Sequence, residues 1–129
     1  MRVLLDTQVW RWILADPDRL SIGSHAVLQD GNSDLLLSAA SAWEIAIKVG
    51  LGKLELPGPP DVVVPQMVEH SRVTPFPVLH THALRVAQLP PHHRDPFDRL
   101  LVAQAQMEQV PIMTADPKFA HYGVEVMSP

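Results

Sequence analysis

The chain has 129 residues, which fits one domain, and 47% of them are apolar, which is enough for an ordinary hydrophobic core. It contains no cysteine, so disulfides and thiolate metal sites are excluded. The net charge of −4 argues against binding nucleic acid through bulk positive charge, so a polyanionic substrate would need a local basic patch or bound cations.

The N-terminal stretch is a poor signal peptide, because Arg2 is followed by an acidic residue at Asp6. No apolar run reaches the roughly 18 residues of a membrane span. We therefore expect a single cytoplasmic domain over residues 1–129 that does not enter a membrane.

Short apolar runs alternate with amphipathic stretches in the first half of the chain. Buried strands are predicted at 3–5 and 35–37, and helices at 7–14, 21–30 and 41–49, with a small-residue turn at 38–41. Ser21 predicts the cap of the second helix, and the spacing of Ser41 to Glu44 fits a capping box at the third.

Prolines separate the elements of the second half. Helices are predicted at 61–71, 81–89 and 95–110, and strands at 73–78, 112–113 and 124–127. Pro75 and Pro77 restrict their strand to a sheet edge, because proline cannot donate to a central ladder. Asp95 followed by Pro96 is typical of a helix start, with the aspartate as N-cap.

This alternation of strands and helices predicts an α/β fold with a mostly parallel sheet and helices on both faces. Three predicted strands lead into an acidic residue: Asp6, Glu44 and Asp116. Asp98 lies in the first turn of the predicted helix at 95–110. Taken singly, each acid is better explained as a helix cap or, for Glu44, as a partner of Lys48. The carboxyl ends of parallel strands share one edge, however, and ligands bind at that edge.

Four carboxylates in one cleft repel one another and raise each other's pKa values unless a cation compensates. Mg²⁺ and Mn²⁺ prefer such oxygen ligands. These ions activate water and neutralise a phosphodiester in its transition state, so hydrolysis of that bond is the chemistry an all-carboxylate site favours. Bound metal would also hold the phosphate that the acidic surface cannot.

Four stretches give the chain a resemblance to PIN domains, and most closely to the VapC-like toxins of bacterial toxin–antitoxin pairs. They are LLDTQVW at 4–10, SAASAWEIAIKVGLGKL at 38–54, HRDPFDRLLVAQA at 93–105 and TADPKF at 114–119. The resemblance implies a Rossmann-like three-layer α/β/α fold with about five strands and Mg²⁺- or Mn²⁺-dependent endoribonuclease activity. It also implies a homodimer and inhibition by a cognate antitoxin.

Carried over by position, the resemblance assigns roles to five residues of this chain. Asp6 would be the central metal ligand, with Asp98 and Asp116 binding directly or through water, and Glu44 would position a second metal or the attacking water. Thr114 matches the hydroxyl residue beside the last acid. Gln8 departs from the small polar residue common after the opening Asp-Thr, while Asp95 is interpreted as a cap.

Other polar and aromatic residues have competing interpretations. Arg94 and Arg99 either steady phosphates or pair with Asp95, and Arg11, Lys48, Lys53 and Lys118 are RNA contacts or solvated charges. A zinc site at His80, His82, His92 and His93 is disfavoured, because the first two cannot share a helical face and the others lie in a proline-rich loop. Trp10 and Trp43 are interpreted as core or dimer-interface residues.

Two other functions stay open at this point. One is a housekeeping RNA-processing or structure-specific DNA nuclease, which an antitoxin-like reading frame immediately upstream would disfavour. The other is a non-catalytic interaction module whose acids are only caps, which an absence of divalent-ion binding would favour.

Overall fold

The computed structural model describes all of residues 1–129, and a five-stranded sheet lies at its centre. The strands are β1 (Arg2–Leu5), β2 (Asp34–Ser38), β3 (Thr74–Phe76), β4 (Ile112–Met113) and β5 (Val126–Met127). Their order is β3-β2-β1-β4-β5, and every neighbouring pair is parallel. The predicted parallel sheet of about five strands is confirmed, and the first strand of the chain is its central one.

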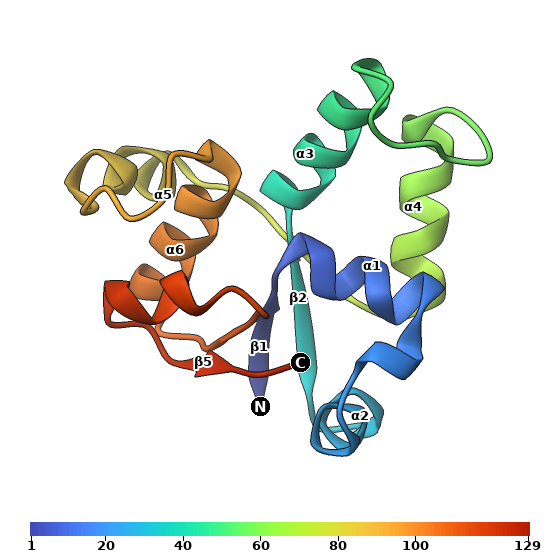
Figure 1. Cartoon of the computed structure of the whole chain (residues 1–129), viewed down its shortest axis with the longest axis horizontal. Helices are drawn as coiled ribbons and strands as arrows, with labels where there is room; N and C mark the ends of the chain where they lie inside the picture. The colour runs from blue at the N-terminus through green and yellow to red at the C-terminus, as the bar shows by residue number, and fades with distance from the viewer.

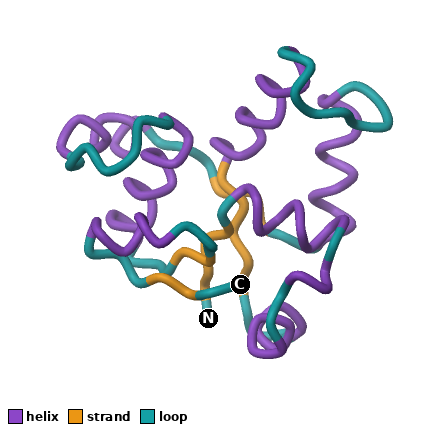
Figure 2. The backbone as a smooth tube through the Cα atoms, in the orientation of Figure 1, coloured by secondary structure: helices purple, strands orange, loops and turns teal.

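Helices cover both faces of this sheet, which gives three layers. They are α1 (Thr7–Ala15), α2 (Ile22–Gln29), α3 (Ala39–Gly50), α4 (Pro60–Ser71), α5 (His80–Arg85) and α6 (Pro96–Glu108), with 3-10 turns at Pro17–Arg19, Val86–Gln88 and Pro117–Tyr122. Figure 1 shows α5 and α6 on one side and α1, α2 and α4 on the other. In the tube view of Figure 2 the strands form a narrow central layer between the two groups of helices.

The central strand divides the core into two clusters, because successive side chains of a strand point to opposite faces. Leu4 packs in the cluster that includes Leu101 of α6, whereas Val3 and Leu5 pack in the cluster that includes Trp10 of α1. All five side chains are fully buried. The predicted core position of Trp10 is therefore confirmed, and its indole N–H donates to Ser71 Oγ at 2.9 Å.

The predicted elements differ from the observed ones mainly at their ends. The expected turn at 38–41 is wrong, since α3 begins at Ala39 and Ser38 caps it by accepting from the N–H of Ala40 at 3.0 Å. Ser41 lies inside that helix, so the expected capping box with Glu44 does not form. The helix expected at 81–89 is instead α5 followed by the 3-10 turn Val86–Gln88. The strand with Pro75 lies at the sheet edge, as predicted.

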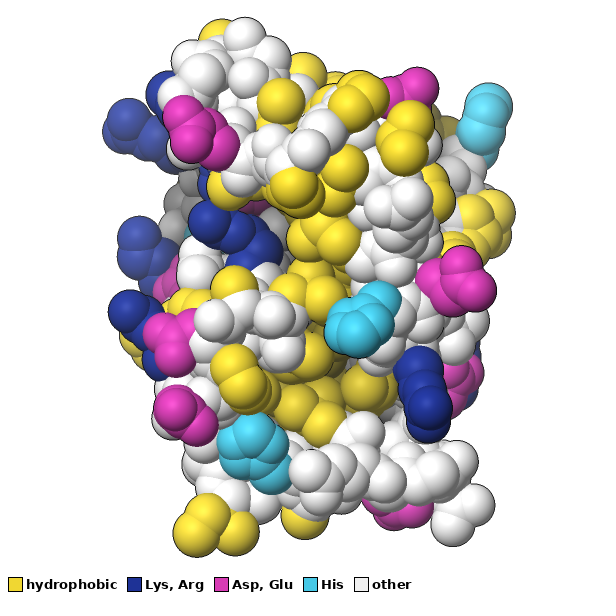
Figure 3. All heavy atoms as spheres, turned by 90° about the vertical axis from the view of Figure 1, so that its right-hand side faces the viewer, with side chains coloured by type: hydrophobic (Ala, Val, Ile, Leu, Met, Phe, Trp, Pro, Cys, Tyr) yellow, Lys and Arg dark blue, Asp and Glu magenta, His cyan; other side chains and the backbone are white.

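The surface is uneven in polarity. On the face at the right of Figure 1, where α2 and α4 lie, apolar side chains form a continuous band between charged ones (Figure 3).

Trp43 lies on α3 with 52% of its surface exposed, and it contacts the Phe97 ring edge-on at 4.9 Å between centroids. Of its two expected positions, the core is thus wrong, and a place in a dimer interface stays a prediction. None of the helices combines the length and the hydropathy that a membrane-spanning segment requires.

Candidate active site

Four acidic side chains from four separate elements line one cleft at the carboxyl edge of the sheet. Asp6 follows β1, Glu44 lies on α3, Asp98 lies in the first turn of α6, and Asp116 follows β4. The cleft has a volume of about 220 Å³, and all four acids line it. Residues separated by up to 110 positions in the sequence are therefore gathered where the parallel sheet was expected to place them (116 − 6 = 110).

Two hydroxyl groups organise the base of the cleft. Thr114 Oγ1 donates to Asp6 Oδ2 at 2.7 Å and accepts from the N–H of Asp116 at 3.0 Å, so a single side chain links the two acids. The buried Thr7 donates from Oγ1 to Ser41 Oγ at 2.7 Å, which joins α1 to α3 beneath the acids. Asp6 makes no side-chain capping bond to α1, so its carboxylate is not engaged as a helix cap.

Asp95 is the N-cap of α6, as predicted. Its Oδ1 accepts from the N–H groups of Phe97 and Asp98, at 2.8 and 3.2 Å. Glu44 also keeps its predicted structural partner, because Lys48 Nζ lies 2.6 Å from its Oε2. Glu44 is nevertheless buried and lines the cleft, so pairing with Lys48 does not remove it from the site.

Burial and mutual repulsion disturb the ionisation of the cluster. Burial raises the pKa of Asp98 to about 7, and the nearby carboxylates of Asp95, Asp6, Glu44 and Asp116 add to the effect. Burial likewise raises the pKa of Asp6; the hydrogen bond from Thr114 opposes this effect, and the charges of Glu44 and Asp116 add to it. Raised pKa values in a cleft lined by several acids indicate a site in which negative charge is not compensated by the protein.

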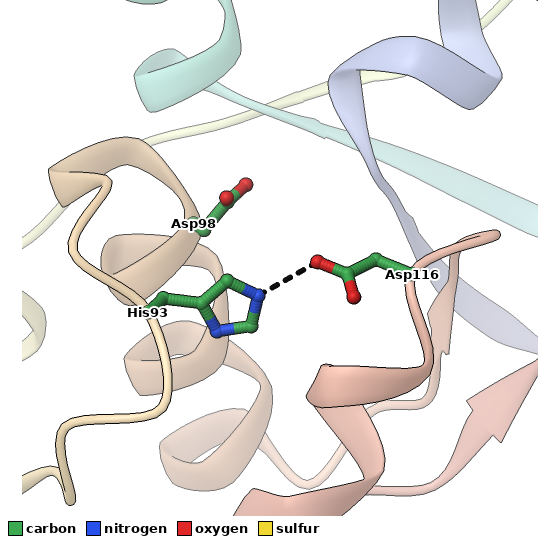
Figure 4. A group of neighbouring side chains, drawn as sticks. All are labelled: His93, Asp98 and Asp116. Carbon is green, nitrogen blue, oxygen red and sulfur yellow. Dashed lines mark hydrogen bonds and ion pairs between the residues drawn. The ribbon is translucent and has the colours of Figure 1, made fainter.

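Asp116 differs from the other acids. Burial acts to raise its pKa, but the hydrogen bonds from His93 and from the N–H of Lys118, together with the charges of these two residues, leave the pKa below its usual value. His93 Nε2 lies 2.8 Å from Asp116 Oδ2, and one ligand atom from each of His93, Asp98 and Asp116 lies within 4.8 Å of the others. Figure 4 shows the His93 ring directed at Asp116, with Asp98 on the neighbouring helix.

His93 was not among the residues that the sequence assigned to the acidic site. The sequence pattern places it in a proline-rich loop with no periodicity, and its partners lie 23 and 29 residues further on. Only its position directly before the Arg-Asp-Pro-Phe-Asp motif could have pointed to the site. The other histidine with a buried ring, His82, contacts Glu108 and the N–H of Leu79 away from the cleft.

The basic residues divide into two groups. Arg11 and Lys48 line the cleft beside the acids, together with Gln8. Arg99 instead donates to the backbone carbonyls of Val86, Leu89, Pro90 and His93, at distances from 3.0 to 3.4 Å. The expected pairing of Arg99 with Asp95 is therefore wrong, because Arg99 holds the loop before α6 and pairs with no acid, whereas phosphate contact stays a prediction.

The donor set suits a hard divalent cation. Its carboxylate oxygens are the ligands that Mg²⁺ and Mn²⁺ prefer, and no cysteine is present. The half-buried Asp98 carboxylate accepts no hydrogen bond within the protein and has the raised pKa described above. A bound cation would supply the missing compensation; Asp98 and Asp116 offer oxygens within 4.8 Å of each other that could hold it, and Asp6 and Glu44 line the same cleft.

Solved structures with the same fold come from bacterial toxin–antitoxin complexes. The VapBC2 structure from Rickettsia felis, bound to a DNA fragment from its promoter, aligns over 98% of both chains with a TM-score of 0.72 and 15% identity. The VapBC-1 structure from nontypeable Haemophilus influenzae aligns over 99% of this chain and 98% of that one, with a TM-score of 0.68 and 16% identity. At these identities the likeness concerns the fold.

Sequence similarity gives the family. Ribonuclease VapC16 of Mycobacterium tuberculosis is 46% identical over 59 residues, which are 46% of this chain and 42% of that protein. The match thus spans less than half of this curated relative. The profile of the PIN domain family matches residues 3–125, which is nearly the whole chain. With the acids gathered at the carboxyl edge of a parallel sheet, this match shows that the chain belongs to the PIN domain family.

Proposed function

We propose that this chain is a Mg²⁺- or Mn²⁺-dependent endoribonuclease and the toxin of a toxin–antitoxin pair. The observation that carries the proposal is the convergence of Asp6, Glu44, Asp98 and Asp116 on one cleft. A helix cap explains Asp116 and an ion pair with Lys48 explains Glu44, but the Asp6 carboxylate caps no helix. Separate structural roles also leave unexplained why Asp6, Glu44 and Asp116 lie near enough to add to the raised pKa of Asp98, which is caused first by burial.

The residues of the cleft would have distinct tasks. Asp6, held by Thr114, and Asp116 would bind a cation together with Asp98, while Glu44 would orient the attacking water. When bound, such a cation lowers the pKa of water and stabilises the charge that develops on a scissile phosphate. Arg11 and Lys48 add positive charge at the rim of the cleft, where the RNA backbone would approach an otherwise acidic protein.

The proposed partner is an antitoxin protein, and the proposed assembly is a homodimer in the cytoplasm. The similarity to Ribonuclease VapC16 and the fold shared with VapBC complexes support this assignment. The continuous apolar band of Figure 3 supports it further, because large apolar patches on a protein surface mark sites of protein–protein interaction.

The test is cleavage of a structured RNA pool by purified protein with Mn²⁺, with Mg²⁺ and with EDTA. We expect cleavage only with metal, and products that carry free 5′-phosphates, since water is the nucleophile. Asp6→Asn should abolish cleavage without loss of fold, whereas Asp61→Asn, at an exposed position of α4, should cleave normally. Cyclic 2′,3′-phosphate ends, or cleavage in EDTA, would show that a metal-activated water is not used.

A further inference from the structure

His93 bridges two parts of the site that the chain supplies separately. It lies in the loop directly before α6, the helix that carries Asp98, and its Nε2 contacts Asp116 Oδ2, in the turn after β4, at 2.8 Å. The other ring nitrogen, Nδ1, lies 2.9 Å from the hydroxyl of Tyr122. The side chain of His93 is only 5% exposed, so neither nitrogen exchanges these partners for solvent.

The contact with Asp116 requires that Nε2 of His93 carries a proton. An ionised Asp116 only accepts hydrogen bonds, so Nε2 must be the protonated nitrogen that donates to it. In the neutral ring Nδ1 is then an acceptor, and the Tyr122 hydroxyl donates to it. Every polar atom of the ring is satisfied in this arrangement. Its Nε2 therefore faces the site as a donor and has no lone pair to offer a metal.

Aromatic packing and two backbone contacts hold the ring in place. Tyr122 stacks on His93 with an interplanar angle of 14° and 5.5 Å between centroids, and the Phe119 centroid lies at 4.8 Å. Both rings belong to the 3-10 turn Pro117–Tyr122 that Asp116 caps. Arg99 donates to the carbonyl of His93 at 3.4 Å, and Gln106 Nε2 donates to the carbonyl of Tyr122 at 3.1 Å, so α6 anchors both partners.

Asp116 remains able to bind a cation while it accepts these bonds. Its Oδ2 accepts from His93 and its Oδ1 accepts from the N–H of Lys118 at 2.9 Å. Each carboxylate oxygen has two lone-pair sites, so one remains free on each. Ligating carboxylates are commonly held by such outer hydrogen bonds, which fix the orientation of the ligand before the metal arrives.

We infer that His93 and Tyr122 are positioning residues that hold the Asp116 carboxylate opposite Asp98, in the orientation that a divalent cation requires. This inference rests on the proposed function, because it assigns Asp116 and Asp98 to one metal site. The effect would be to fix, before binding, the distance between an acid on α6 and an acid after β4. Without the bridge, the binding of metal would have to order Asp116 itself.

The test compares Mn²⁺ binding, measured by isothermal titration calorimetry, among the full-length wild type and matched variants. His93→Phe keeps an aromatic ring and removes the donor, and we expect the Kd to rise by about 10-fold or more, as for other outer hydrogen bonds to metal ligands. Tyr122→Phe removes only the hydroxyl and should raise the Kd by roughly 2- to 10-fold, the value of one neutral hydrogen bond. His93→Gln restores an amide donor and should bind nearly as the wild type does.

His92→Phe is the matched control, since the His92 ring also packs on Tyr122 at 4.9 Å but is exposed and makes no contact with Asp116. A second readout needs no metal: the ¹⁵N spectrum of the wild-type imidazole should show Nε2 of His93 protonated and Nδ1 unprotonated. The concentration of Mn²⁺ for half-maximal RNA cleavage should rise in parallel with the Kd.

The outcomes separate the inference from the function on which it rests. A wild type that binds no Mn²⁺ refutes the proposed function. A wild type that binds Mn²⁺ while His93→Phe and Tyr122→Phe bind it equally well overturns the inference alone. So does a spectrum in which the diamagnetic ion Zn²⁺ converts Nε2 to an unprotonated ligand nitrogen, because His93 would then bind the metal directly. If His93→Phe does not fold, Tyr122→Phe and the spectrum of the wild type still decide.

Discussion

Replacing Asp98 by asparagine should make the metal-free protein more stable at neutral pH. The folded state raises the pKa of this carboxyl from 3.8 to about 7, chiefly through burial. Because the folded-state pKa lies above the unfolded one, protonated Asp98 contributes to the free energy of unfolding. This contribution is fully present below pH 4 and is lost as the pH rises to about 7. Above pH 7 the folded protein therefore carries the full cost of an ionised, uncompensated Asp98.

The size of this cost follows from the pKa values. A change from 3.8 to about 7 corresponds to about 4 kcal/mol before screening, and because Asp98 is only half-buried, solvent should reduce this to about 1–2 kcal/mol. The variant also loses a charge that favours the N-terminus of α6, worth about 0.3–1 kcal/mol. The net gain should be about 1 kcal/mol, which corresponds to an increase in Tm of roughly 3–5 °C.

The assay is thermal unfolding in EDTA at pH 8 and at pH 5. Asp98→Asn should unfold at the higher temperature at pH 8, and the difference should shrink at pH 5, where folded Asp98 is protonated. Saturating Mn²⁺ should reverse the order, because only the wild type keeps the full set of ligands. Asp61→Asn, also in the first turn of a helix but exposed, should be slightly destabilised at both pH values. A variant no more stable than the wild type at pH 8 would refute the electrostatic description of the cleft.

Three further changes test other parts of the site. Asp95→Ala should destabilise the protein by about 1 kcal/mol in chemical denaturation, because the α6 cap is lost. Asp95→Asn should have nearly the stability of the wild type. A loss of Mn²⁺ affinity in Asp95→Asn would instead show that Asp95 is a metal ligand. Arg99→Ala should lower the free energy of unfolding by about 2–3 kcal/mol and speed amide hydrogen exchange in the loop at 86–93. Unchanged exchange in that loop would contradict the anchoring role of Arg99. Thr114→Val removes a hydrogen bond that lowers the pKa of Asp6, so the pH of half-maximal cleavage should rise. A shift of that pH to a lower value would contradict this role of the hydrogen bond.

Much of the fold was predictable because its determinants are local in the sequence. Buried parallel strands are short apolar runs, and the prolines at 75 and 77 excluded a central position for their strand. The Asp-Pro pair at 95–96 marked the start of α6 within one residue. The start of α3 was placed too late because Ser38 and Ser41 are equally good caps in the sequence, and only the end of β2 decides between them.

The acids of the site were also predictable, since the edge of a parallel sheet gathers whatever follows its strands. The groups that support those acids were not. The His93 and Arg99 side chains act through contacts made only after folding: the ring reaches Asp116 and Tyr122, and the guanidinium reaches four loop carbonyls. Neither contact has a periodicity or spacing that a sequence would reveal. The sequence could not decide between the core and a dimer interface for Trp43, because an apolar residue on a helix is compatible with either environment.

The order of strands in the sheet has a consequence for synthesis on the ribosome. The central strand, β1, spans residues 2–5, but its neighbour on one side, β4, spans residues 112–113 and is made much later. A nascent chain that has not yet reached β4 contains Asp6 without Thr114 or Asp116. Translation therefore completes the acidic cleft only after β4 and the turn behind it have been made, and fragments released earlier lack two of the groups that surround Asp6.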